Sequence, residues 1–328
     1  MKMRAVVCER YGPPEVLRIQ EVERPVPKDN EVRVRVCATT ASTGDCELRR
    51  FDLPLWLWLP ARIGFGIRGP RSKILGQELA GEVDAVGRGV RRFREGDRIF
   101  ARTGFSMGAY AEYACLPEDG PVAAMPANVS FEEAAPVPMG GLEALHFLRA
   151  AGSLDGREVL INGAGGSIGT FAVQIAKAWG AEVTAVDSHG KLDMLRSIGA
   201  DRVIDYRKED FTTGGEAYDV IFDVVGGCPF DRCLRSVRKG GAYLMANPGL
   251  SQMARGRWTS RTSSRRVVFG AASDKAEDLA YLGELMASGE MSSVIDRRYP
   301  LEEAAEAHRY VEQGQKKGSV VLTVGPCR

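Results

Sequence analysis

The chain has 328 residues, enough for two domains that each bury their own core. Hydrophobic residues make up 44% and charged residues 27%, as is typical of a globular enzyme. The 44 Lys and Arg nearly balance the 43 Asp and Glu, so the net charge gives no global electrostatic case for nucleic-acid or membrane binding.

The cysteines are scattered, with no CxxC pair and no zinc-ribbon spacing. An odd, dispersed set predicts reduced thiols. The start of the chain, MKMRAVVCERYG, contains no apolar signal core, and together these features predict a cytoplasmic protein. The seven cysteines are Cys8, Cys37, Cys46, Cys115, Cys228, Cys233 and Cys327.

Residues 1 to 125 lack helical periodicity and have the pattern of short strands separated by turns, for example at 4–8, 16–22 and 31–39. Many short strands at close spacing predict a barrel-like β domain. A closing strand is expected at residues 319–324, and we expect it to return to this domain.

An apolar stretch, LPLWLWLPARIGFGI, occupies residues 53–67. It is too short to span a bilayer, and Pro54, Pro60 and Arg62 interrupt it. One interpretation is a core or lid segment that lines an apolar pocket. The alternative is that Trp56 and Trp58 touch a membrane surface or a partner.

Residues 159–187, VLINGAGGSIGTFAVQIAKAWGAEVTAVD, have the pattern strand, glycine turn, helix and strand. Glycines let the backbone approach a pyrophosphate, the helix start offers free N–H groups, and the acid that ends the second strand can hold a ribose hydroxyl. The segment therefore predicts a dinucleotide-binding site. Its expected binding residues are Ala164, Gly165, Gly166, Ser167, Ile168, Gly169 and Asp187.

Strands and helices alternate after Asp187, which predicts a doubly wound parallel sheet. Before the dinucleotide motif, a helix opens with a capping box at Ser130 and Glu133, and residues 139–141 are expected to interrupt it. Residues 251–266 hold five arginines and Trp258. They are interpreted as a solvated loop, with contact to an anionic substrate tail or a dimer partner as the alternative.

Five motifs occur in order along the chain: ILGQELAGEV, GGLEALHFL, INGAGGSIGTFAVQIAK, VIDYRKEDF and YDVIFDVVG. Through them the sequence resembles the medium-chain dehydrogenase/reductase superfamily, and more narrowly its zinc-independent quinone oxidoreductase branch. The resemblance implies an α/β protein. Residues 1–125 and 268–328 would form a GroES-like substrate domain, and residues 126–267 a Rossmann domain, with an active-site cleft where they meet. It also implies a homodimer.

The resemblance allows a test for metal. Zinc-dependent relatives hold the catalytic ion with Cys, His and Cys, and the matching positions here are Ser42, Gln77 and Met139. Hydroxyl, amide and thioether groups form a poor Zn²⁺ site. The family's structural zinc lobe, with four closely spaced cysteines, is also missing from the sequence, so no metal is expected.

Without a Lewis acid, the expected reaction is hydride transfer from a reduced nicotinamide to an already electrophilic acceptor, a quinone or an α,β-unsaturated carbonyl. Ser42, Asp45 and Gln77 are expected to line the cleft and orient the acceptor carbonyl, with the proton coming from water. Asp45 could equally be a strand-end turn carboxylate, and Gln77 a satisfied core amide. Val225 and Asn247 complete the expected cofactor contacts.

Two arguments conflict over the cofactor. Asp187 should bind the ribose diol and repel a 2′-phosphate, which favours NADH. NADPH-using relatives instead hold that phosphate with a Lys and a Tyr, which match Lys191 and Tyr206, while Ser188 and His189 lie in the same turn. We expect a slight preference for NADPH with dual use open; Lys191 as a solvated helix residue and Tyr206 as a sheet-edge aromatic are the alternatives.

Two further functions stay open. An enoyl-thioester reductase of the same superfamily would give the arginines of residues 251–266 a role. A non-catalytic NADPH-binding, crystallin-like protein is the other. Glu143 stands where the family often has Thr, and it would either point away from a nicotinamide or tune its site. His146 and His308 are expected to be structural.

Overall fold

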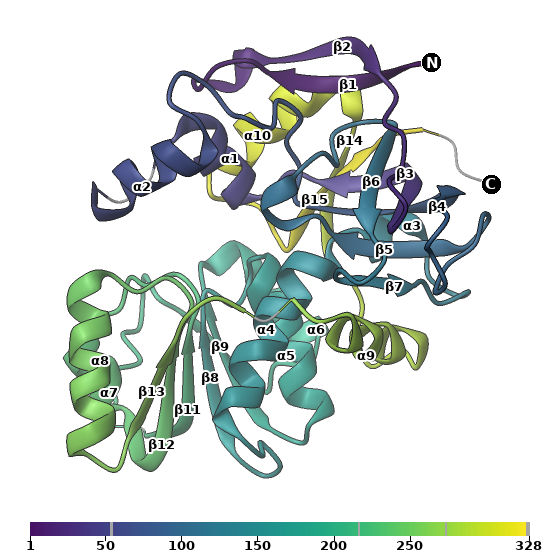
Figure 1. Ribbon diagram of the computed structural model, residues 1–328. Helices are drawn as coiled ribbons and strands as arrows, with labels where there is room; N and C mark the ends of the chain where they lie inside the picture. Colours follow the sequence, from purple (N-terminus) through teal and green to yellow (C-terminus); the bar gives the residue numbers. More distant parts are fainter. Residues whose placement is uncertain (53–54, 216, 273, 326–328) are drawn as a thin grey trace. The chain divides into compact units, whose positions relative to one another are not determined.

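The computed structural model describes residues 1–52, 55–215, 217–272 and 274–325. The chain forms two compact units (Figure 1). The first comprises residues 1–139, 274–287 and 295–328, and the second residues 140–273 and 288–294. The first unit is therefore built from both ends of the chain. The assignment of residues 1–125 and 268–328 to a substrate domain stays a prediction.

The first unit contains a seven-stranded, mainly antiparallel sheet in the order β14-β15-β3-β4-β5-β7, with β6 also paired to β3. The expected closing strand is confirmed, because β15 runs antiparallel to β3 with Val321 opposite Thr40. The strands are β3 (Glu31–Thr40), β4 (Glu78–Val86), β5 (Arg98–Arg102), β6 (Tyr113–Pro117), β7 (Val122–Ala124), β14 (Ile295–Pro300) and β15 (Ser319–Thr323). A separate hairpin pairs β1 (Lys2–Cys8) with β2 (Leu17–Glu23).

Alternation along β3 shows how this sheet is stabilised. Val32, Val34 and Val36 are buried in the core of the unit, as the two-residue period of a strand requires. The residues between them are partly exposed, and Arg35 forms an ion pair with Glu82 of β4 at 2.8 Å. The hydrophobic face therefore fixes the register of β3.

The first unit also contains helices that the sequence analysis did not predict. They include α1 (Thr43–Arg50) and α2 (Leu55–Phe65), so the expectation of strands alone before residue 125 is wrong. The other elements are α3 (Phe131–Ala134), α9 (Ala276–Ala287), α10 (Ala304–Glu312), and the 3-10 turns η1 (Pro14–Val16), η2 (Gly104–Ser106) and η4 (Leu301–Glu303).

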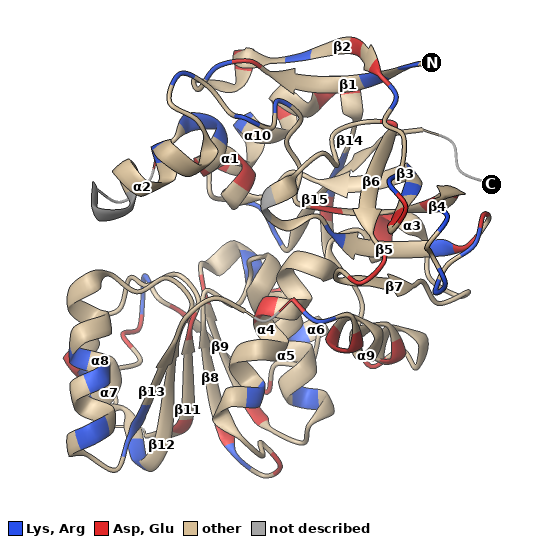
Figure 2. Cartoon of the chain, in the orientation of Figure 1, with Lys and Arg blue, Asp and Glu red and all other residues tan. Residues whose placement is uncertain are grey.

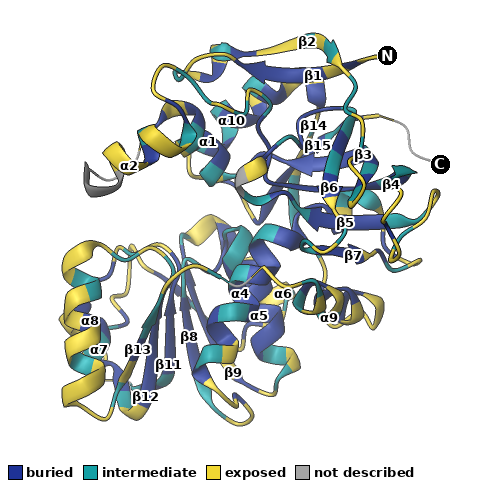
Figure 3. Ribbon diagram, in the orientation of Figure 1, coloured by how far each residue is buried: buried dark blue, intermediate teal, exposed yellow. Residues whose placement is uncertain are grey.

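The second unit contains a six-stranded parallel sheet in the order β10-β9-β8-β11-β12-β13 (Figure 1). The chain runs outward from β8 to one edge and then from β11 to the other, so the predicted doubly wound sheet is confirmed. Figure 3 shows these strands largely buried. They are β8 (Glu158–Asn162), β9 (Glu182–Asp187), β10 (Arg202–Asp205), β11 (Tyr218–Asp223), β12 (Val237–Met245) and β13 (Arg266–Phe269).

Helices connect these strands. They are α5 (Ser167–Ala178), η3 (His189–Lys191) with α6 (Leu192–Ser197), α7 (Phe230–Arg235) and α8 (Leu250–Thr262). The expected break at residues 139–141 is wrong, because α4 (Val137–Ala151) runs through them. Gly140 lies within the helix, and its missing side chain leaves room for α5, because a Cβ there would lie 2.8 Å from the Phe171 ring.

The interpretation of residues 251–266 as a loop is also wrong, because most of them form α8. Its sequence, LSQMARGRWTSRT, contains several good helix formers. The Gln252 side chain accepts a hydrogen bond from the Gly249 amide at 2.8 Å and so caps the helix start.

Three cysteines of the described residues are disulfide-bonded: Cys37, Cys228 and Cys233. Cys228 and Cys233 form a disulfide across the start of α7, with Cα atoms 6.4 Å apart. The expectation of reduced thiols is therefore wrong for Cys37, Cys228 and Cys233. Cys46 is buried and free, and burial raises the pKa of its thiol to about 12, so it is a poor nucleophile. Cys327 lies outside the described residues.

Candidate functional site

The turn between β8 and α5 is built so that only glycine fits at two positions. Gly163 has φ +83°, and the amides of Gly163 and Ala164 donate to the Val186 carbonyl at 3.0 and 3.1 Å. A Cβ on Gly169 would lie 2.4 Å from the Gly163 oxygen. A Cβ on Gly166 would meet only that oxygen, at 3.7 Å, so Gly166 leaves space open beside the turn. Sequence analysis missed Gly163, although it directly follows β8.

This turn also presents a helix start suited to an anion. α5 begins at Ser167 with Gly166 as N-cap, and among the described residues no side chain caps that end. The first amides of a helix lack backbone acceptors, and the helix dipole adds partial positive charge. The predicted residues 164–169 therefore offer backbone donors and little steric obstruction to a pyrophosphate.

Asp187, at the end of β9, is held by the glycine turn. Its carboxylate accepts hydrogen bonds from the Gly165 amide at 2.8 Å and the Ser188 amide at 2.7 Å. Lys191 Nζ lies 3.3 Å from Asp187 Oδ1. The Lys191 stem covers Gly165, where a Cβ would lie 2.4 Å from Lys191 Cδ. Lys191 is buried, so it is not the solvated helix residue of the alternative interpretation.

Tyr206 lies beside this group, directly after β10. Its amide contacts the Asp187 carbonyl at 3.3 Å, and its side chain is 54% exposed. The Arg207 guanidinium carbon lies 5.8 Å from the Tyr206 ring centroid. His189 Nδ1 is 3.9 Å from an oxygen of Asp205. Sequence analysis did not single out Arg207, although it stands within the VIDYRKEDF motif.

Val225 and Asn247 lie on the other side of β8. A Cβ on Gly163 would be 2.6 Å from Val225 Cγ1, so the turn after β11 lies against the glycine turn. Asn247 Nδ2 donates to the Val224 carbonyl at 2.8 Å. The structure therefore brings all the predicted cofactor residues to the carboxyl ends of β8, β9, β10, β11 and β12, where doubly wound sheets bind ligands.

Asp223 fixes the strand ends at this switch point, and sequence analysis did not assign it a role. It is fully buried and accepts from Asn162 Nδ2 at 2.9 Å, the Gly226 amide at 3.0 Å and Tyr243 Oη at 3.1 Å. Burial raises the pKa of the Asp223 carboxyl, while these hydrogen bonds lower it. The network positions the turns after β8 and β11.

In the first unit, the predicted residues Ser42, Asp45 and Gln77 form one hydrogen-bonded cluster. Ser42 Oγ lies 2.7 Å from Asp45 Oδ2, and Gln77 Nε2 lies 3.4 Å from Asp45 Oδ1. Asp45 is not a strand-end turn residue. It belongs to the capping box of α1, in which its amide donates to Ser42 Oγ at 3.0 Å. Burial raises the pKa of the Asp45 carboxyl.

The third position matched to a zinc ligand joins the same region. Glu78 follows Gln77 and accepts from the Met139 amide at 2.8 Å and from the Thr40 hydroxyl. Burial raises the pKa of Glu78 to about 8. Ser42, Gln77 and Met139 supply hydroxyl, amide and thioether groups, which do not fit zinc. In the part of the chain that the structure describes, no group of three or more His, Cys, Asp and Glu could hold a metal.

His308 packs behind this cluster. Its Nε2 lies 2.9 Å from Tyr110 Oη and its Nδ1 3.4 Å from Cys46 Sγ. Tyr110 Oη also lies 3.1 Å from the Thr40 carbonyl, to which it donates. Burial lowers the pKa of His308 to about 3, so the ring is neutral. The contacts support the structural role expected of His308.

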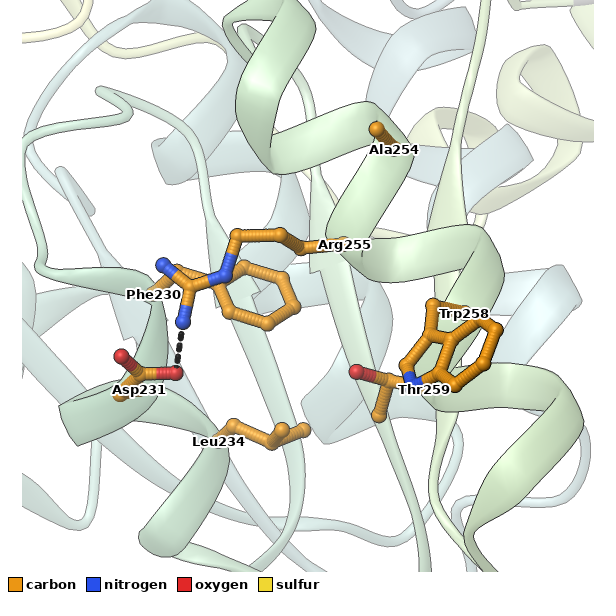
Figure 4. A pocket seen from close by; sticks show the side chains of 7 residues that line it. All are labelled: Phe230, Asp231, Leu234, Ala254, Arg255, Trp258 and Thr259. Atoms are coloured by element: carbon orange, nitrogen blue, oxygen red, sulfur yellow. Dashed lines mark hydrogen bonds and ion pairs between the residues drawn. The ribbon is translucent and has the colours of Figure 1, made fainter.

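One arginine of α8, Arg255, lines a cavity of about 450 Å³ between α7 and α8 (Figure 4). Arg255 forms an ion pair with Asp231, and its guanidinium carbon lies 4.9 Å from the Phe230 ring centroid. Its charge is thus already paired, which weakens the case for an anionic substrate tail. The lining residues are Phe230, Asp231, Leu234, Ala254, Arg255, Trp258 and Thr259.

Comparison with known proteins identifies the family. The alcohol dehydrogenase GroES-like domain family matches residues 28–127, and the zinc-binding dehydrogenase family matches residues 198–322. The chain is 31% identical to "Quinone-oxidoreductase QR1, chloroplastic" of Triphysaria versicolor, over 98% of both proteins. It belongs to the medium-chain dehydrogenase/reductase superfamily, quinone oxidoreductase-like branch.

Two further relatives of this medium-chain dehydrogenase/reductase are informative. The chain is 28% identical to "NADPH-dependent alkenal/one oxidoreductase, chloroplastic" of Arabidopsis thaliana, over 98% of this chain and 79% of that protein. The solved quinone oxidoreductase of Coxiella burnetii superposes with a TM-score of 0.88 at 27% identity, over 99% of this chain and 100% of that one.

The matched family's description names zinc, but the donor set of this medium-chain dehydrogenase/reductase does not fit that ion. The second unit does fit a nicotinamide dinucleotide, through the open glycine turn and the start of α5. Over the described ranges, this quinone oxidoreductase-like chain has no helix with the length and apolar character needed to cross a bilayer.

Proposed function

We propose that the protein is a zinc-independent, NAD(P)H-dependent oxidoreductase that transfers hydride to a quinone or an α,β-unsaturated carbonyl. The observation that carries the proposal is the glycine turn between β8 and α5, with Asp187 and Lys191 beside it. The similarity to a quinone oxidoreductase and to an alkenal/one oxidoreductase supports this acceptor class.

The bound nicotinamide supplies the hydride. The chain's own residues bind the nucleotide and orient the acceptor. The start of α5 would hold the pyrophosphate, and Asp223 keeps the turns after β8 and β11 in place. The Gln77 amide carries the donor group that would orient the acceptor carbonyl, and Asp45, which accepts the Ser42 hydroxyl proton, positions the Gln77 side chain. No strong acid stands free in this cluster, so water supplies the proton.

We further infer a slight preference for NADPH, with NADH also used. Asp187 would repel a 2′-phosphate if its charge were free. Lys191 lies 3.3 Å from that carboxylate, and the exposed Tyr206 lies beside Arg207. Lys191 offsets the Asp187 carboxylate, and Lys191 and Arg207 are both cations that can pair with phosphate. A homodimer and a cytoplasmic location stay predictions from the sequence.

The test is a titration of the purified, metal-stripped protein with NADPH and with NADH, followed by nicotinamide fluorescence. A simple quinone, an enone and an enoyl thioester are then added in separate reactions. Tight binding with oxidation by the quinone or enone supports the proposal. Turnover with the thioester alone would replace it with an enoyl-thioester reductase. Binding without turnover on any acceptor would indicate a non-catalytic binder.

A further inference from the structure

The helix α2 (Leu55–Phe65) leaves apolar side chains uncovered. Its sequence, LWLWLPARIGF, contains only apolar residues and glycine apart from Arg62. A helix that is apolar on all sides is normally covered by protein or lipid. Yet Leu59 is 62% and Ile63 59% exposed, and Ile67, just beyond the helix, is 74% exposed. Figure 3 shows this side of α2 as exposed. Residues 53–54 lie outside the described residues.

Other side chains of α2 pack against the rest of the first unit. The Arg62 guanidinium carbon lies 4.5 Å from the Tyr11 ring centroid and 4.2 Å from that of Phe51. Arg62 Nη1 also donates to the Ile67 carbonyl at 2.8 Å. Ala61 is buried. Because one side of the helix is anchored in this way, the exposed apolar residues belong to a fixed surface.

A basic edge adjoins this apolar surface. Arg68, Arg71 and Lys73 are exposed, and no acid in the described ranges forms an ion pair with any of them. Residues 53–73 contain four basic and no acidic residues. Among nearby acids, Asp52 is ion-paired with Arg50 at 3.3 Å. Figure 2 shows no acidic residue on α2. The protein as a whole is nearly neutral, so this positive charge is local.

We propose that α2 and residues 66–73 dock on the surface of an anionic lipid bilayer. Leu59, Ile63 and Ile67 would enter the boundary between headgroups and acyl chains, and Trp58, which is 41% exposed, would lie at headgroup level. Arg68, Arg71 and Lys73 would contact lipid phosphates. The helix has 11 residues and is too short to cross the bilayer, so it lies along the surface.

An anionic bilayer fits these observations better than a second copy of the chain. A self-complementary interface needs acids opposite its basic edge, and residues 53–73 offer none. A bilayer containing anionic lipid supplies both the apolar layer for α2 and the negative charge for the basic edge. The proposal does not depend on the reaction proposed above.

The first test is co-sedimentation of the full chain with vesicles of phosphatidylcholine alone and of phosphatidylcholine mixed equally with phosphatidylglycerol. We expect binding to the anionic vesicles only, weakened by added salt. Arg68→Gln with Arg71→Gln should lower the vesicle affinity about fivefold per residue, about 25-fold together. Arg88→Gln with Arg91→Gln, which removes the same charge from another exposed surface, should leave vesicle binding unchanged.

The second test removes the apolar contact. Leu59→Ser with Ile63→Ser should weaken binding to anionic vesicles at least about tenfold, because two exposed apolar side chains no longer enter the bilayer. Val26→Ser, at a residue that is 80% exposed elsewhere, is the control. Failure of the wild type to bind anionic vesicles at low salt would overturn the proposal. So would a wild-type oligomer that Leu59→Ser with Ile63→Ser converts to monomer, since a second copy would then cover α2.

Discussion

Asp187 accepts hydrogen bonds from the amides of Gly165 and Ser188, which leaves Lys191 to balance its negative charge. Lys191→Ala should therefore weaken NADPH binding about 10- to 100-fold, the loss typical of one charged hydrogen bond. NADH affinity should change much less. Fluorescence titration with both nucleotides measures the two affinities.

A second ion-paired lysine of the same unit provides the control. Lys177 forms an ion pair with Asp201 at 2.8 Å, at the other end of α5 from the glycine turn. Lys177→Ala should leave both affinities unchanged. Equal losses of NADPH and NADH in Lys191→Ala would remove Lys191 from the phosphate site and would assign it a structural role in the turn.

Ser42 has two roles that a matched pair of variants can separate. It caps α1, and its hydroxyl donates to the Asp45 carboxylate that positions the Gln77 amide. Ser130 makes the same capping box with Glu133 at the start of α3, away from the proposed site residues. Ser42→Ala and Ser130→Ala should each lower the free energy of unfolding by about 1 kcal/mol. Only Ser42→Ala should also lower kcat/KM for the quinone.

Denaturant unfolding and steady-state kinetics on both variants give the comparison. The Asp45 carboxyl would lose the Ser42 hydroxyl hydrogen bond, which lowers its pKa, so its pKa should rise further in Ser42→Ala. If both variants keep wild-type kcat/KM, Ser42 is a helix cap and nothing more.

At the scale of elements, two glycines of the turn between β8 and α5 have different roles. Gly169 is needed for the fold, and Gly166 for nucleotide binding. A Cβ on Gly169 would clash with backbone, 2.4 Å from the Gly163 oxygen and 2.5 Å from Ala164 Cα. Gly169→Ala should therefore destabilise the protein by about 1–3 kcal/mol, since α5 must shift away from the turn. Gly166→Ala meets nothing closer than 3.7 Å and should change stability by less than about 1 kcal/mol, since the poorer N-cap is partly offset by the lower entropy of the unfolded chain.

Gly166→Ala, which has the smaller effect on stability, should have a clear effect on nucleotide binding. A methyl group on Gly166 occupies the space where the pyrophosphate approaches the start of α5, so Gly166→Ala should weaken both nucleotides. Thermal unfolding of the free protein and fluorescence titration test the pair. Wild-type nucleotide affinity in Gly166→Ala would refute the assignment of this turn as the pyrophosphate site.

Elements with a strong local signal could be predicted from sequence, and elements fixed by tertiary contacts could not. The apolar strands β8 and β9 and the glycine turn carry their own pattern. α1 was missed although Ser42 and Asp45 have capping-box spacing, because its short sequence lacks a clear apolar stripe. α8 was missed because a run of arginines and serines was interpreted as solvated.

The residues of the candidate site likewise divide into those that local sequence could predict and those that depend on tertiary contacts. Backbone requirements at residues 164–169 and the strand-end position of Asp187 could be predicted. Arg207, Gly163 and the network around Asp223 could not, because their roles depend on which strand ends lie next to each other in the sheet. The Cys228–Cys233 disulfide was missed because α7 brings together residues whose spacing is not a CxxC pair.

At the scale of the whole chain, residues distant in sequence bury several titratable groups together in the first unit. His308 contacts both Tyr110 and Cys46, and Asp45 lies close enough to Glu78 to raise the pKa of Glu78. Burial lowers the pKa of His308 to about 3 and raises that of Glu78 to about 8. The His308 shift makes the free energy of unfolding rise with pH, and the Glu78 shift makes it fall with pH.

The window between pH 6.5 and 8 isolates Glu78. His308 costs stability only when pH falls below its unfolded pKa of about 6.5. The folded state keeps Glu78 protonated up to about pH 8, whereas the unfolded chain releases that proton near pH 4.5, so stability falls as pH rises through this range. Glu78→Gln keeps a neutral group that can accept from the Met139 amide and no longer titrates.

Between pH 6.5 and 8 we therefore expect the wild type to lose about 2 kcal/mol more unfolding free energy than Glu78→Gln. Urea unfolding at several pH values measures both slopes. Glu95→Gln, which removes an exposed carboxyl from the loop before β5, should keep the wild-type slope. Equal slopes in wild type and Glu78→Gln would mean that Glu78 is ionised in the folded protein. The Thr40 hydroxyl and the Met139 amide would then have to stabilise a buried carboxylate beside Asp45, and Arg102 would be the nearby cation that balances it.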